Sequence, residues 1–146
     1  MSQEATTDNF LELVPNARGI VHLATKIYYL SPDSVSEPML LSGIGLAGAK
    51  DGWSAKRSYG HISALELSTL DLSNIDLVVL GYHEIHSGEA LHALHASLKF
   101  AGVKNVLITL WDVPGEGRQA FFGLFYKYLA KSQSIETALK NTRKKL

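Results

Sequence analysis

The chain has 146 residues, of which 46% are hydrophobic, and it balances 14 basic against 14 acidic residues. A chain of this kind can bury about two-thirds of the surface that its unfolded form exposes, so we expect one folded domain and exclude a disordered chain. The balanced charge argues against nucleic acid or a membrane as partner. We interpret the basic C-terminal cluster as the solvated end of a helix. This cluster comprises Lys140, Arg143, Lys144 and Lys145.

The full sequence contains no cysteine. This absence excludes disulfides, thiolate metal sites and every cysteine nucleophile. Residues 1–9 are polar and lack the features of a signal peptide, and no apolar run has the length of a membrane span. We therefore expect a cytoplasmic location, with a nuclear one as the alternative.

The first half of the chain is predicted to contain strands separated by a long loop. The apolar, β-branched run at 19–24 predicts a buried strand, and 39–42 predicts a weaker one. Residues 43–60 mix glycines, charges and a tryptophan without any period, which predicts a loop around an edge hairpin. The mixed periodicity of 62–72 predicts a short helix that leads into the next strand.

The second half alternates buried strands with helices. The continuous apolar run at 77–80 is typical of a central parallel strand. Ser87 is predicted to cap a helix that ends at Gly102 in a left-handed conformation. A strand at 106–110 and two further helices follow, the first over 116–131. This order predicts an α/β fold with a parallel sheet flanked by helices in three layers.

Three segments together carry a family resemblance. They are 22–25 (HLAT), then 76–80 (DLVVL), then the series formed by Gly88-Glu89, 100–103 (FAGV), 110–113 (LWDV) and the helix with Phe125-Tyr126. In this order and spacing they resemble the CHAT domain. CHAT domains are caspase-like peptidase modules, related to separase and the caspases and often attached to tetratricopeptide repeats.

The resemblance implies a peptidase fold from which the catalytic pair has been lost. The family's first strand leads to a His-x-x-x-His-Gly motif whose second histidine is the general base, and here that position is Lys26. The family's nucleophilic cysteine aligns with His83. Covalent peptidase chemistry needs a thiolate and a nearby imidazole, whereas a lysine is protonated at neutral pH and cannot act as base. The positions expected to line the former cleft are His22, Lys26, His83, Glu84 and Trp111.

The resemblance also implies a missing part of the sheet. We assign 1–18 to an N-terminal tail with a short helix, and 19–146 to a partial CHAT domain that lacks the family's N-terminal strands. An edge of the sheet that is left open needs cover from a partner. The sequence therefore predicts a catalytically inactive module that binds a protein partner or a second copy, or forms part of a repeat-bearing scaffold.

The histidines leave an alternative open. On a helix, His92 and His95 stand one turn apart, and Glu89 is one turn further back, which is an acceptable ligand stripe in outline. The pattern matches no zinc hydrolase motif such as His-Glu-x-x-His, so surface or hydrogen-bonded histidines are the favoured interpretation. The alternative function is a hydrolase with altered histidine chemistry, with or without a metal. Its low-ranked metal candidates are His83, His86, His92 and His95.

The segment from Gly43 to Gly48 satisfies the spacing of a dinucleotide-binding loop. That loop requires a helix to begin directly after the glycines, where it receives the pyrophosphate. The residues that follow, 50–54, are predicted to continue the loop. A flexible insertion is therefore the favoured interpretation. We expect no cofactor.

Overall fold

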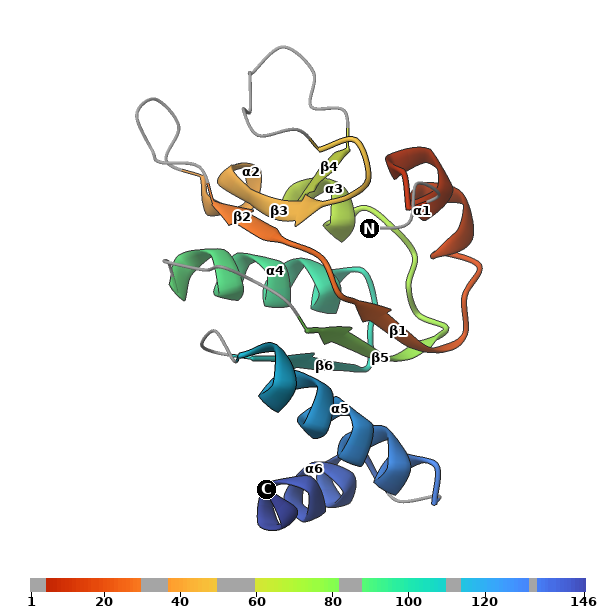
Figure 1. Ribbon diagram of the computed structural model, residues 1–146. Helices are drawn as coiled ribbons and strands as arrows, with labels where there is room; N and C mark the ends of the chain where they lie inside the picture. Colours follow the sequence, from red (N-terminus) through yellow and green to blue (C-terminus); the bar gives the residue numbers. More distant parts are fainter. Residues whose placement is uncertain (1–4, 30–36, 50–59, 82–87, 110–113, 132–133) are drawn as a thin grey trace. The chain divides into compact units, whose positions relative to one another are not determined.

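The computed structural model describes residues 5–29, 37–49, 60–81, 88–109, 114–131 and 134–146. The chain divides into two compact units, Met1–Asp112 and Val113–Leu146. The first unit contains two small sheets with their helices, and the second is a pair of helices (Figure 1). Each unit is described by itself.

The first unit is built on a parallel sheet with the order β1-β5-β6. Its strands are β1 (Gly19–Leu23), β5 (Ile75–Leu80) and β6 (Asn105–Ile108). Every residue of β5 except Asp76 is buried. Side chains that face one side, such as Val78, join the main core, and those that face the other, such as Val79, are buried as well. The prediction of a central parallel strand is confirmed, and so is the parallel α/β fold with its flanking helices.

Helix α4 (Gly88–Phe100) connects β5 to β6. It buries Ala90, Ala93, Leu94, Ser97 and Leu98. The turn after it passes through Gly102, whose φ of 95° confirms the predicted left-handed residue. A Cβ on Gly102 would lie 3.2 Å from the backbone of Ser73, so this glycine also permits a close approach between two segments.

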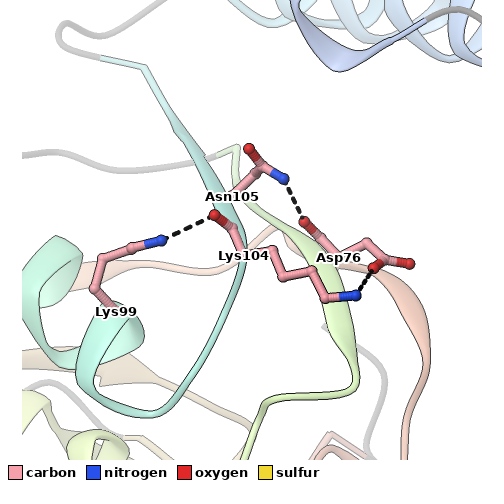
Figure 2. Close-up of polar contacts among 4 residues, drawn as sticks. All are labelled: Asp76, Lys99, Lys104 and Asn105. Carbon is pink, nitrogen blue, oxygen red and sulfur yellow. Dashed lines mark hydrogen bonds and ion pairs between the residues drawn. The ribbon is translucent and has the colours of Figure 1, made fainter.

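Polar contacts hold the start of β6 beside the start of β5 (Figure 2). Lys99 Nζ donates to the backbone carbonyls of Val103 and Lys104 at 3.0 and 2.9 Å. Lys104 Nζ lies 2.6 Å from a carboxylate oxygen of Asp76, and Asn105 Nδ2 donates to the Asp76 carbonyl at 3.0 Å. Both partners of the ion pair are more than half exposed, at 60% and 55%. Such a pair contributes about 0–1 kcal/mol, so the buried residues of β5 dominate the stability of the sheet.

A second, antiparallel sheet has the order β2-β3-β4. Its strands are β2 (Ile27–Tyr29), β3 (Ser42–Gly45) and β4 (His61–Ser63). Pairing of β3 with β4 agrees with the expected hairpin, but β2 was not predicted and 43–45 is strand where loop was expected. The weak strand at 39–42 is also wrong, because α2 (Pro38–Leu41) forms one helical turn there. Proline suits the first turn of a helix, where its missing N–H has no partner to lose.

Two short helices complete the first unit. Helix α3 (Ala64–Ser68) begins with a capping box in which Ser63 and Glu66 bond to each other's backbone N–H groups. The short helix predicted within 62–72 is therefore present, preceded by β4. Helix α1 (Thr7–Leu13) is capped by Thr6 and places Phe10 in the core.

The second unit consists of α5 (Gly115–Leu129) and α6 (Ile135–Lys145), which pack on each other. Phe122 and Phe125 are buried on α5, and Ala138 and Thr142 are buried on α6. Both helices were predicted. The Ser134 hydroxyl accepts the Thr137 N–H at the start of α6, which fixes where that helix begins.

We expect Gly43→Ala to lower the free energy of unfolding by about 1–3 kcal/mol. An added Cβ would overlap the Ile62 carbonyl oxygen and the ring of Tyr28, so the strand would have to shift. Gly45→Ala is the matched control, because its Cβ would meet the nearest atoms at 3.7 Å, an ordinary contact. Urea unfolding of both variants measures the difference. Equal losses would contradict a close approach at Gly43.

Candidate functional site

The parallel strands bring three chain segments to one edge of the sheet. Leu23 at the end of β1 pairs with Leu80 of β5, which pairs in turn with Ile108 of β6. The Gly81 N–H donates to the Leu23 carbonyl at 3.2 Å, which extends the alignment by one residue. The segments that begin at Ala24, Gly81 and Thr109 therefore leave the sheet side by side. Ligands bind at this carboxyl edge in open α/β sheets.

Lys26 leaves this edge from β1, and its backbone is fixed. Its carbonyl accepts the Gly45 N–H at 2.8 Å. The adjacent Thr25 is buried and donates its hydroxyl to the Gly45 carbonyl. The Lys26 side chain is exposed. The antiparallel sheet thus holds the backbone at this position while the ammonium group remains on the surface.

His22 lies within β1 on the face opposite the core. Val21 and Leu23 pack against the core cluster, so alternation along the strand places His22 and Ile20 on the other face. His22 is exposed. Desolvation of its buried part lowers the pKa of His22 below the usual histidine value. The neutral imidazole is therefore favoured.

The remaining cleft candidates, His83, Glu84 and Trp111, lie outside the described residues. The structure describes only the end of the strand that precedes each of these residues. Residues 82–87 connect β5 to α4, and 110–113 follow β6. The strand ends that precede these positions lie at one edge of the sheet, and of the five candidates only Lys26 and His22 are described.

One contact at this edge was not anticipated. The Tyr29 hydroxyl donates to a Glu89 carboxylate oxygen at 2.7 Å. Tyr29 belongs to β2, which begins directly after Lys26, and Glu89 lies in the first turn of α4. The bond therefore ties together two segments that flank the candidate site. No pattern in the sequence indicated this bond, because β2 has three residues and was not predicted.

The histidines of α4 are both exposed, at His92 and His95. Within the described part of the chain, no group of three or more His, Asp or Glu side chains is placed to hold a metal ion. His83 and His86 lie outside that part. His61 packs edge to face on Tyr28, with ring centroids 5.0 Å apart. Burial and the nearby charge of Glu66 raise the pKa of Tyr28.

Two of the three dinucleotide-like glycines lie in a strand, and Gly48 lies in the turn after it. Gly43 and Gly45 belong to β3 and pair with Ser63 and His61 of β4. A pyrophosphate loop instead places its glycines between a strand and the helix that follows it. The strand at Gly43 and Gly45 therefore differs from the arrangement of a dinucleotide loop, and it also differs from the flexible insertion that was predicted.

The family model of the CHAT domain matches residues 1–146. The chain belongs to the CHAT domain family. A comparison with curated proteins found no match. The matched range includes 1–18, which precede the segments that carry the resemblance. The caspase-like sheet and the peptidase ancestry follow from this membership.

The resemblance described above assigns two family positions to residues of this chain. It aligns the general base with Lys26 and the nucleophile with His83, which lies outside the described residues. An ammonium group has three donors and no lone pair, so Lys26 can bind an acceptor such as a carbonyl or a carboxylate. Among the described helices, none combines the length and apolarity that a membrane span requires.

We expect the His22 imidazole to titrate below a histidine in the unfolded chain. Between the two pKa values the unfolded state binds more protons, so the free energy of unfolding rises with pH through that window. NMR titration measures the pKa of His22. Urea unfolding at several pH values measures the free energy of unfolding through that window. His22→Asn should remove this part of the pH dependence. His95→Asn, at an exposed site on α4, should leave it in place, and a change of equal size there would contradict the assignment.

Proposed function

We propose that this CHAT domain is a catalytically inactive pseudopeptidase that acts as a protein-interaction module. One observation carries the proposal: the full sequence contains no cysteine. The covalent step of caspase-like chemistry is attack by a thiolate on the peptide carbonyl. Without a thiol that step has no nucleophile, whatever the alignment of individual positions.

The position of the general base supports the same proposal. A base must accept the proton of the nucleophile and return it to the leaving amine. Lys26 is exposed beside the carboxyl edge of the sheet, where an ammonium group can only donate hydrogen bonds. Both catalytic roles are thus vacant, while the fold that once positioned them is retained.

The sheet offers a surface for the proposed interaction. Within the described residues, β1 pairs with β5 alone, so its other edge carries no strand. Ile20 in this strand is 44% exposed. An edge of this kind is a template for strand addition. We propose that a partner protein or a second copy pairs there. Attachment to tetratricopeptide repeats, common in the family, would make the module part of a scaffold.

Incubation of the purified chain with a complex peptide library tests the loss of activity. We expect no sequence-specific cleavage by mass spectrometry, with or without added zinc, because the sequence contains no thiol to act as the nucleophile. Specific cuts that His83→Ala abolishes would overturn the proposal and favour the alternative, a histidine-based hydrolase. His92→Ala is the control, since it removes an exposed imidazole from α4 instead.

Substitution at Ile20 tests the edge of the sheet. A lysine on an edge strand opposes pairing with another strand. If a second copy pairs with β1, sedimentation velocity at about 1 M salt should show a dimer that Ile20→Lys abolishes, because pairing of this kind depends on backbone bonds and not on charge. Leu65→Lys is the matched control, as Leu65 on α3 is 42% exposed. A monomer at every concentration would exclude a second copy at this edge.

A further inference from the structure

The neutral chain consists of two oppositely charged units. Residues 113–146 contain seven basic and two acidic residues, a formal net charge of +5. Because the whole chain has no net charge, residues 1–112 carry −5. The average over the chain conceals this asymmetry. Association through charge is therefore available to the protein even though its total charge is zero.

The basic charge of the second unit forms a stripe on α6. Ala138 and Thr142 are the buried residues of this helix. Helical spacing places Lys140, Arg143 and Lys144 on the opposite face, and all three are exposed. Lys140 and Lys144 are one turn apart, about 6 Å along the axis. We call these three residues the α6 stripe.

Interactions within the unit do not account for the stripe. The dipole of a helix favours positive charge in its last turn, which suits Arg143 and Lys144 but does not extend to Lys140. Within the described residues, none of the three takes part in an ion pair. Glu136, the one acidic residue on α6, is exposed one turn before Lys140 on the same face and offsets part of the charge. The three cations of the stripe still outnumber this carboxylate, so the face presents net positive charge to the solvent.

The packing of the unit disfavours a lipid or nucleic-acid partner. A helix that binds a membrane inserts its apolar face, but that face of α6 packs on α5. Proteins that bind single strands offer aromatic rings for stacking. Here the rings of α5 pack on one another, as Phe121 and Phe122 do at 5.2 Å and Phe125 and Tyr126 at 5.4 Å. The stripe thus offers charge alone, which suits exposed carboxylates.

Helix α1 carries carboxylates with the matching spacing. Asp8 and Glu12 are exposed and also one turn apart, on the face opposite the buried Phe10. Leu11 lies beside them and is 41% exposed, so the same face adds apolar area. Two carboxylates about 6 Å apart can therefore meet two ammonium groups about 6 Å apart.

We propose that the chain self-associates head to tail, with α1 of one copy docked on the α6 stripe of the next. The two surfaces differ, so the contact is heterologous, and a pair of copies retains one unused α1 and one unused α6 stripe at its two ends. Exposed ion pairs are individually weak, so the association is of low affinity and depends on salt. This interface is separate from the edge of β1, and it does not depend on the loss of peptidase activity.

A charge-swap experiment on the full chain tests the proposal. Sedimentation velocity is measured from about 10 µM to about 1 mM protein. The chain should associate at about 0.01 M salt, where the Debye length is about 30 Å. The association should be lost at about 1 M salt, where the Debye length is about 3 Å. Asp8→Lys with Glu12→Lys, or Lys140→Glu with Lys144→Glu, should each weaken association about tenfold or more. An equimolar mixture of the two double variants should restore it. Circular dichroism checks that each variant is folded.

Other outcomes overturn the proposal. Lys127→Glu with Lys131→Glu reverses one cation in the last turn of α5 and one in the turn that follows it, so it matches the change in net charge away from the stripe. If this control weakens association as much, the attraction follows net charge and not the α6 stripe. A monomer at low salt, or no recovery in the mixture, would equally refute the α1 contact. Binding of a 20-base-pair DNA duplex through Lys140 and Lys144, without self-association, would assign the stripe to nucleic acid.

Discussion

Parallel pairing of β5 with both of its neighbours is the constraint on which the candidate site depends. Because the three strands run in the same direction, the segments that follow Leu23, Leu80 and Ile108 leave the sheet at one edge. The pairing is maintained by the buried side chains of β5, none of which belongs to the site. A CHAT domain can therefore exchange its catalytic residues without altering the core that positions them.

The parts of the fold that could be predicted are those with local signals. The apolar run in β5 and Gly102 after α4 are such signals, because each predicts its local structure from a few neighbouring residues. By contrast, position 43 requires a glycine because a Cβ there would overlap the ring of Tyr28 and the carbonyl of Ile62. Both residues are distant from Gly43 in the sequence. The short apolar run in α2 fits a strand and a helix equally well. Only the proline before it favours the helix.

For the described part of the candidate site, the position of Lys26 after a strand was predictable, but the contacts around it were not. The order of strands and helices is enough to place Lys26 beyond the end of β1. The bond from Tyr29 to Glu89 required knowing that β2 approaches the first turn of α4, which no periodicity indicates. The charge asymmetry was concealed for another reason, since it appears only after the boundary between the two units is known.

The strand order also has a consequence for the entropy of assembly. Residues 77 and 105 are joined when β5 pairs with β6, and residues 19 and 75 when β1 pairs with β5. The second pairing closes a segment about twice as long, which costs about 0.6 kcal/mol more in chain entropy. The β5-α4-β6 segment is thus the more local half of the sheet. The strand that leads to Lys26 is the long-range addition to it.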